Sequence, residues 1–307
     1  MDYDFTEDQA AILGGLEQLI GSLNIEPPKD AVFSAYSQPL DDELTAGGYL
    51  DITSQEGFGL LDGALIVEQL AQLPVSVEAA TSVLIAPVFL EDTTRRPVAI
   101  LAGALTKPAR FLPMAKTLLA DIGDDLLRIE IPEGAVEEVA TLFAYPYGRL
   151  KNPENLPRVS LGSAQLPTFR RRWRIAIAVE SSGLMQSALN LVLEHVKTRQ
   201  QFGRPIGSFQ AIQHRLVMAA ELGQAVRWLG LRAAWSDSES DAAIAATFAQ
   251  DAIPRFCTDL HQFCGAMGLT LEFPLHHWTY RLRALLGELG GSSAQAIAAA
   301  DTTWGQK

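Results

Sequence analysis

The chain has little cysteine, a deficit of basic residues and no metal-binding pattern. Its two cysteines, Cys257 and Cys264, are seven residues apart in a stretch with helical spacing. That spacing puts them about 10 Å apart along a helix axis, too far for a disulfide. The adjacent His276 and His277 lack the spacing of zinc ligands, so we expect no metal site. With 24 Lys and Arg against 36 Asp and Glu, the net charge is −12, which argues against a nucleic-acid or anionic-membrane partner.

Long apolar runs are also lacking. No run approaches the ~20 residues that cross a bilayer, and the acidic residues 1–5 lack the basic region that opens a secretory signal. We therefore expect a soluble, cytoplasmic protein with no membrane span. The apolar fraction of 48% over 307 residues is ample for a buried core in one or two domains, or in one larger unit.

Three segments of different character predict an α+β fold. Residues 1–91 have helical spacing: Thr6 and Gln9 resemble a capping box at the start of a first helix, and further helices are expected over about 40–48 and 59–72. Residues 92–163 contain short strand-like runs separated by Gly, Pro and Asp, which predict a small β-domain. These runs are Pro97–Leu101, Thr117–Ala120, Leu126–Ile131 and Arg158–Leu161.

The third segment, residues 164–307, predicts a four-helix bundle. Its helices are expected over about 170–201, from about 208 onward, over 240–266 and over 281–300. Pro254 should kink or break the third of these helices.

One stretch of this segment carries chemistry: Arg199-Gln200-Gln201-Phe202-Gly203-Arg204-Pro205-Ile206-Gly207-Ser208-Phe209-Gln210. Gly203 fits the left-handed position after a helix, and Pro205 follows where a helix cannot continue. Arg199 would then lie in the last turn, where a cation can complement the helix dipole. Its planar paired donors also suit a phosphate. Both interpretations of Arg199 stay open on spacing alone.

This stretch and a second one, Gln262 to Leu275, resemble motifs of the acyl-CoA dehydrogenases, and the order of the segments is similar too. The resemblance implies an N-terminal helical domain, a middle β-domain and a C-terminal four-helix bundle, with FAD in a groove between subunits. In this family Arg199 would pair with the FAD phosphates, and the same side would be lined by Gln201, Phe202 and Gln210. Gln262 and Gly265 would contact the adenosine half, where Ala266 stands in place of a common second Gly.

Simpler roles remain open for three of these residues. Phe202 is equally compatible with packing in the core. Gln262 and Gly265 are also compatible with a role limited to capping the end of a helix.

The resemblance also implies a reaction that needs a base. The family removes a proton beside a thioester carbonyl and passes a hydride from the β-carbon to flavin, so a Glu must stand at the α-carbon. At the two positions that supply this Glu the chain has Leu289 and Trp173. Glu288 is one residue early, a turn of about 100° on a helix, and is the alternative base. Glu180 fits an ordinary solvated or paired helix residue.

The middle domain also looks shortened where the family holds the flavin ring. Thr106-Lys107-Pro108 is the only trace of the first flavin-contacting piece, with Lys in place of Glu. The resemblance therefore implies the shortened subunit of a heteromeric enzyme of the α2β2 type, similar to the paired bacterial dehydrogenases of steroid side-chain degradation. A full-length partner would share the FAD, the substrate would be an acyl-CoA, and electron-transfer flavoprotein would be the acceptor.

Two alternatives are kept. The chain is a self-sufficient homo-oligomeric acyl-CoA dehydrogenase that uses Glu288, or it is a non-catalytic scaffold that retained the fold.

Overall fold

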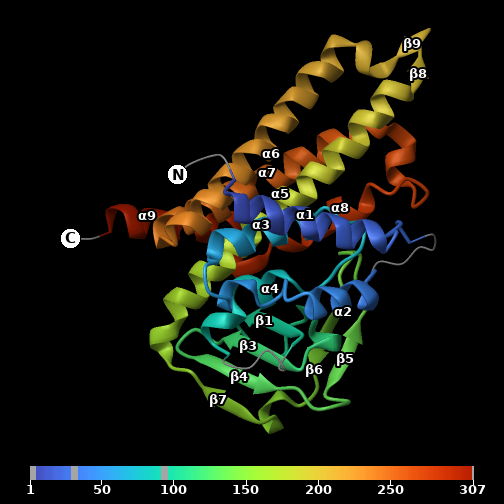
Figure 1. The fold of residues 1–307 in the computed structure, drawn as a ribbon. Coiled ribbons are helices and arrows are strands. Elements are labelled where there is room, and N and C mark those ends of the chain that lie inside the picture. Colours follow the sequence, from blue (N-terminus) through green and yellow to red (C-terminus); the bar gives the residue numbers. More distant parts are fainter. Residues whose placement is uncertain (1–4, 29–33, 91–95, 306–307) are drawn as a thin grey trace.

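A single long helix, α5 (Leu166–Thr198), runs through the centre of the fold (Figure 1). The computed structural model describes residues 5–28, 34–90 and 96–305. Every residue of α5 from Ile175 to Met185 is buried, as expected for a helix that is covered on all sides. Three helices of the C-terminal bundle pack around it, α6 (Gln210–Ser236), α7 (Glu239–Cys264) and α8 (His276–Leu285), and α9 (Gly291–Trp304) packs against α7.

By length and composition α5, with the turn before it (Ser163–Thr198), passes as a candidate membrane span. The sequence scan missed it because Glu180, Ser181 and Ser182 interrupt its apolar residues. Of its most apolar window, 78% is buried inside the molecule, so here α5 serves as the core helix of the bundle.

The described N-terminal residues form four α-helices, α1 (Glu7–Ser22), α2 (Gln38–Ala46), α3 (Leu60–Ala71) and α4 (Ala80–Leu84). Of these, α3 and α4 pack on α5, and α1 packs on α3. The capping box predicted at Thr6 is confirmed: the Gln9 amide donates to Thr6 Oγ1 at 3.2 Å, and the Thr6 amide donates to Gln9 Oε1 at 3.1 Å. The predicted N-terminal segment also includes residues 1–4, which lie outside the described residues.

Two small sheets lie below the helices in Figure 1. The first has the order β1 (Val98–Ala102), β3 (Thr117–Asp121), β4 (Leu126–Glu130), β7 (Arg158–Ser160), and only β1 and β3 run parallel. These are the four predicted strands. The second sheet, β2 (Ala109–Arg110), β6 (Tyr147–Leu150) and β5 (Val136–Val139), was not predicted, because its strands are very short or lack an apolar alternation.

The α+β fold is confirmed, and three local predictions are corrected. The helix expected to reach Gln201 ends at Thr198. It is followed by a hairpin of β8 (Gln200–Gln201) and β9 (Arg204–Pro205), whose turn residues Phe202 and Gly203 have φ of 53° and 78°. Two positive φ values suit a two-residue hairpin turn, so Gly203 serves the hairpin and not the helix end.

The other two corrections concern α7 and the last predicted helix. α7 continues through Pro254 without a break. The helix expected over 281–300 is two helices separated by a corner, η9 (Glu288–Gly290). Leu289, Gly290 and Gly291 all have positive φ there, which ends a helix. The predicted boundary at residues 91 and 92 lies outside the described residues.

Close contact between α3 and α5 depends on Gly183. A Cβ added there would lie 2.1 Å from the Glu68 carbonyl oxygen and 2.8 Å from Ala71 Cβ. We expect Gly183→Ala to destabilise the protein by about 1–3 kcal/mol through overpacking, measured by urea unfolding. Gly14→Ala, on α1 with nothing within 4 Å of the added Cβ, is the matched control and should stabilise by about 0.5–1 kcal/mol. Equal effects at both sites would contradict the role given to Gly183.

Candidate functional site

A cavity of about 200 Å³ lies where the sheets meet the helical bundle. Its walls come from β1, β2, β6, α5, α8 and η9, so residues far apart in the sequence converge on it. They include Lys107, Arg110, Tyr147, Trp173, Glu288 and Leu289. The two positions from which the sequence analysis expected a base, Trp173 and the corner of Glu288 and Leu289, therefore border one cavity.

Arg110 on β2 is the centre of this site. Its side chain is only 4% exposed. Nη1 donates to both oxygens of Glu180 at 2.8 and 2.7 Å. On its other side Nε lies 2.7 Å from Glu288 Oε1, and Nη2 lies 3.5 Å from Glu288 Oε2. One guanidinium thus bridges two buried carboxylates, and although burial lowers the pKa of Arg110, the two carboxylates outweigh it and hold that pKa well above its usual range.

Glu288 is also held by Trp173, whose indole Nε1 donates to Glu288 Oε2 at 2.6 Å. Burial raises the pKa of Glu288, and the Arg110 guanidinium and the Trp173 donor act in the opposite direction. The argument that a one-residue offset turns Glu288 away assumed a helix. That assumption is wrong, since Leu289 is in the left-handed region at φ 51° and Glu288 lines the cavity. Leu289 lines it too, and packs against the main core.

Glu180 was predicted to be a solvated or paired helix residue. It is paired and not solvated. It is buried, contacts Arg110, and accepts a 2.6 Å hydrogen bond from the Tyr145 hydroxyl. Burial and the neighbouring Glu180 charge raise the pKa of Tyr145 well above its usual range. The sequence analysis did not single out Arg110 or Tyr145. The available signal was that Arg110 stands in a strand of the shortened β-domain, with no acidic residue nearby in the chain to pair with it.

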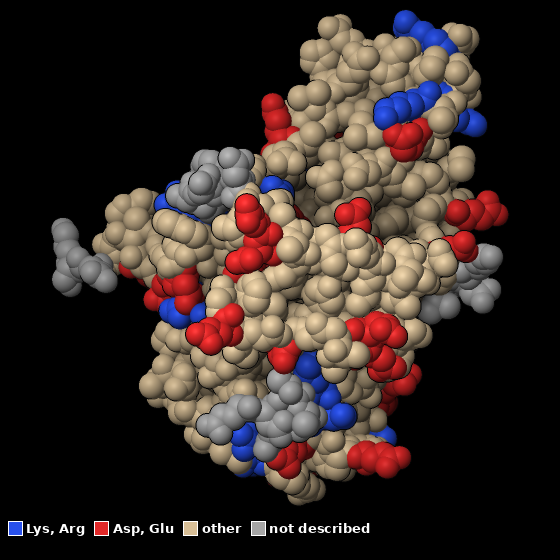
Figure 2. Space-filling view, in the orientation of Figure 1, with Lys and Arg blue, Asp and Glu red and all other residues tan. Residues whose placement is uncertain are grey.

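The predicted phosphate-side residues lie at the opposite end of α5. Arg199 is the C-cap of α5, and Arg199, Gln201, Phe202 and Gln210 are all exposed. Phe202 is 90% exposed, so the alternative that it packs in the core is wrong. Within the described ranges the Arg199 side chain has no hydrogen-bond or ion-pair partner. Figure 2 shows Lys and Arg side chains gathered over this end of the molecule, at the upper right.

Gln262 and Gly265 lie beside a second cavity, of about 490 Å³, at the end of α7 and along η8 (Gly265–Leu269). Arg283 and His261 also line it. The Gly265 amide donates to the Gln262 carbonyl oxygen, so the capping role considered for these residues is present. Gly265 has φ 57° and nothing within 4 Å of an added Cβ, so its backbone faces open space. The ring contact of His195 with Phe273, at 5.2 Å, joins this region to the end of α5.

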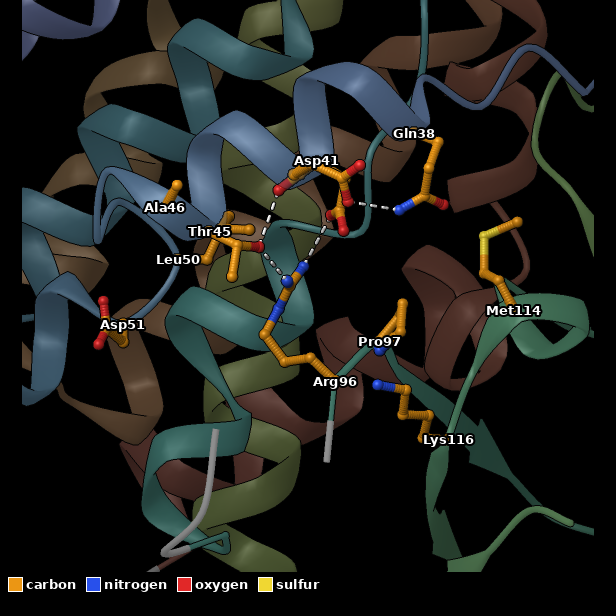
Figure 3. A pocket seen from close by; sticks show the side chains of 11 residues that line it. Gln38, Asp41, Thr45, Ala46, Leu50, Asp51, Arg96, Pro97, Met114 and Lys116 are labelled. Atoms are coloured by element: carbon orange, nitrogen blue, oxygen red, sulfur yellow. Dashed lines mark hydrogen bonds and ion pairs between the residues drawn. The ribbon is translucent and has the colours of Figure 1, made fainter. Parts of the chain in front are cut away.

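A third cavity, of about 640 Å³, lies between α2 and the start of β1 (Figure 3). Arg96 points from it toward Asp41 and Thr45 of α2, to which it donates at 2.9 Å each. It also donates to Ser82 Oγ at 2.7 Å and to the Glu78 carbonyl oxygen at 2.9 Å. Because these donors are used within the chain, Arg96 links α2 and α4 to the sheet.

The two cysteines and the possible metal-ligating groups can be located in the described residues. Over 5–28, 34–90 and 96–305 there is no group of three or more His, Cys, Asp or Glu side chains placed to hold a metal ion. Cys257 and Cys264 are buried free thiols.

Known proteins resemble the chain in sequence and in fold. The family described as "Acyl-CoA dehydrogenase, C-terminal domain" matches residues 168–299. Probable acyl-CoA dehydrogenase YngJ of Bacillus subtilis is 41% identical over 106 residues, covering 33% of this chain and only 28% of YngJ. Acyl-CoA dehydrogenase IpdE2 of Mycobacterium tuberculosis is 27% identical over 237 residues, 72% of this chain and 70% of IpdE2. The crystal structure of the ChsE4–ChsE5 complex from Mycobacterium tuberculosis matches with a TM-score of 0.79 at 21% identity, over 97% of both chains.

The fold is that of the acyl-CoA dehydrogenases. In sequence, the resemblance to this family is carried by residues 168–299 and by the relatives named above.

The hydrogen bond from Trp173 to the Glu288 carboxylate should contribute more to the free energy of unfolding than a hydrogen bond to a neutral acceptor. We expect Trp173→Phe to cost about 1.5–3 kcal/mol of unfolding free energy, because it leaves a charged acceptor without its donor. Trp278→Phe is the matched control: its indole donates to the neutral Gln72 carbonyl oxygen at 2.9 Å, and its loss should cost about 0.5–1.5 kcal/mol. Urea unfolding at neutral pH compares them, and an equal or smaller loss at Trp173 would contradict the assignment.

Proposed function

We propose that the chain is the shortened subunit of a heteromeric FAD-dependent acyl-CoA dehydrogenase and supplies one half of a flavin site shared with a full-length partner. One observation carries the proposal. At the end suited to the phosphates and adenosine, Arg199 is exposed and meets no side-chain partner within the described residues, whereas at the end suited to the flavin ring and the acyl chain the Arg110 guanidinium is already paired with two carboxylates.

The exposed end fits the diphosphate and adenosine of FAD. Arg199 offers paired donors and a charge that meets no side-chain partner in the part of the chain that the structure describes, and phosphate binds such groups bidentately. Gln201 and Gln210 add amide donors, and Phe202 adds an apolar surface. Gln262 and Gly265 border a cavity of about 490 Å³ with Arg283 on its wall, which suits an anionic nucleotide.

The closed end does not fit the flavin ring. Its cavity of about 200 Å³ is below the roughly 300–1,000 Å³ of ordinary ligand pockets, and the charges of Arg110 and Glu288 on its wall are paired with one another. The partner would therefore supply the base, the ring-binding segment and the acyl pocket. Bound FAD supplies the hydride acceptor for α,β-desaturation of the acyl-CoA thioester, while this chain binds and orients the nucleotide end.

The assembly follows from the same division of labour. The chain resembles, over 97% of its length, one chain from the crystal structure of a complex of two proteins, ChsE4–ChsE5, and this likeness supports a pair of unlike subunits. The α2β2 arrangement, a steroid or fatty acyl substrate, electron-transfer flavoprotein as acceptor, and a cytoplasmic location are parts of the proposal. The three domains, residues 1–91, 92–163 and 164–307, are proposed on the same basis.

The first test isolates the native assembly. Affinity purification of the tagged chain from its own host should yield a second, full-length dehydrogenase in equal amount, with about one FAD per pair of chains. The chain expressed alone should carry little flavin and reduce no dye with acyl-CoA. A lone chain with stoichiometric flavin and turnover would falsify the shared site.

Arg199 is tested within that assembly. Removing a charge-assisted hydrogen bond costs about 1.5–3 kcal/mol, so Arg199→Ala should weaken FAD binding by about 10- to 150-fold, measured by flavin release on dilution. Lys197→Ala, which removes an exposed cation two residues before Arg199 that is paired with Glu194, is the control and should change binding little. If Arg199→Ala leaves both flavin retention and the partner's activity unchanged, the scaffold alternative is supported instead.

A second candidate function is favoured by the position of Glu288. It lines the cavity beside Trp173, and burial raises its pKa, as a general base requires. The chain would then be a self-sufficient homo-oligomeric dehydrogenase. That candidate predicts that Glu288→Gln abolishes turnover while FAD stays bound, whereas the shared-site proposal predicts that turnover of the assembly is retained.

A further inference from the structure

Arg110 lines the cavity and also forms an ion pair with Glu288, the carboxylate on the cavity wall that is the candidate base. We propose that Arg110 is a positioning residue that withholds Glu288 from proton transfer, by fixing it as the second partner of a buried ion-pair bridge from β2 to α5 and η9. The proposal deepens the proposed function and rests on it for the meaning of the site.

Both oxygens of Glu288 are engaged. Oε1 lies 2.7 Å from Arg110 Nε, and Oε2 accepts from Trp173 Nε1 at 2.6 Å while Arg110 Nη2 lies 3.5 Å away. A general base needs an oxygen within hydrogen-bond reach of the proton it removes. Here Oε2 accepts from Trp173 and Oε1 is in ion-pair contact with Arg110, so Glu288 would have to give up the ion pair before Oε1 could act as a base.

The backbone that carries Glu288 is held as well. Gln250 Nε2 donates to the Leu285 and Glu288 carbonyl oxygens at 2.7 and 3.0 Å. Gln295 Nε2 donates to the Leu289 carbonyl oxygen at 2.7 Å, and Arg174 Nε in turn donates to Gln295 Oε1 at 2.7 Å. With the corner anchored from α7, α9 and α5, Glu288 has little freedom to swing away from Arg110.

Arg110 itself is anchored by groups that do not touch the cavity. Glu180 takes its Nη1, and the Tyr145 hydroxyl holds Glu180 in turn. Arg281 lies on the far side of the Tyr145 ring, 6.0 Å from its centroid, and donates to the Leu73, Val75 and His277 carbonyl oxygens. Lys107 and Tyr147 are the other titratable groups that line the cavity. Two carboxylates thus face two guanidinium groups, and the buried charges balance.

The test asks whether Arg110 keeps Glu288 ionised. The full chain is compared with Arg110→Leu/Glu180→Gln, which removes one charge of each sign and keeps an acceptor for Tyr145. Each background is also made with Glu288→Gln, and urea unfolding is followed from pH 4 to 9. In each background, the unfolding free energies of the chains with and without Glu288→Gln are subtracted at every pH. The pH dependence of this difference reports the proton bound by Glu288.

Without Arg110, burial is opposed only by the Trp173 donor, so the pKa of Glu288 in the folded chain should rise further. The folded state then keeps a proton that the unfolded state releases above about pH 4.3, so the Glu288 contribution falls as pH rises through this window. We expect the upper end of the window to move by at least about one pH unit, a tenfold change in proton affinity.

An unchanged window in the two backgrounds would overturn the proposal, since Glu288 would then be ionised or protonated independently of Arg110. Arg149→Leu, which removes an exposed partner of Glu137 in the same region, should leave the window unmoved and serves as control. If the leucine variant does not fold, Arg110→Gln/Glu180→Gln makes the same comparison with polar side chains. The measurement needs no second subunit, so failure to find a partner would not affect it.

Discussion

The bridge from Arg110 to Glu180 and Glu288 is the constraint on which the rest of the structure depends. It joins a two-residue strand of a small sheet to the central helix and to the corner before the last helix. A buried ion pair adds little stability compared with apolar packing, but removing one partner costs about 3–5 kcal/mol, because a buried charge is left unpaired. The ion pairs therefore hold β2, α5 and η9 in one arrangement, and this arrangement keeps the cavity small.

That constraint separates the two ends of α5 in chemical character. At one end the charges of Arg110, Glu180 and Glu288 are largely buried and paired with one another. At the other end Arg199 and its neighbours are exposed, and the chain provides no partner for the Arg199 guanidinium within its described residues. The same helix thus connects a site that the chain has closed to a surface that only another molecule can complete.

The sequence predicted the fold class and most helices well, because long helices with apolar spacing carry their own signal. The strands of the first sheet were found for a similar reason, since β1, β3 and β4 are apolar and bounded by Gly, Pro or Asp. The second sheet was missed because strands such as Ala109–Arg110 are too short to show any period.

The candidate site was predicted only in part. Counting along the chain singled out Trp173, Glu288 and Leu289 as separate alternatives, and nothing in the sequence indicates that they border one cavity. Arg110 and Tyr145 were missed because their partner, Glu180, lies 70 and 35 residues away. The helix end near Arg199 was misplaced because a glycine after a helix and a glycine in a tight hairpin leave the same sequence signal.

The turn of that hairpin has a consequence for association. Phe202 holds a left-handed backbone conformation that costs an L-residue about 1–2 kcal/mol, yet its ring is almost wholly in water, edge-on to Phe209 at 6.0 Å. The chain thus maintains an unfavourable backbone conformation that presents an aromatic ring to the outside. A molecule that covers this ring meets a tip already in shape, so less conformational freedom is lost on contact than with a loop that orders only when bound.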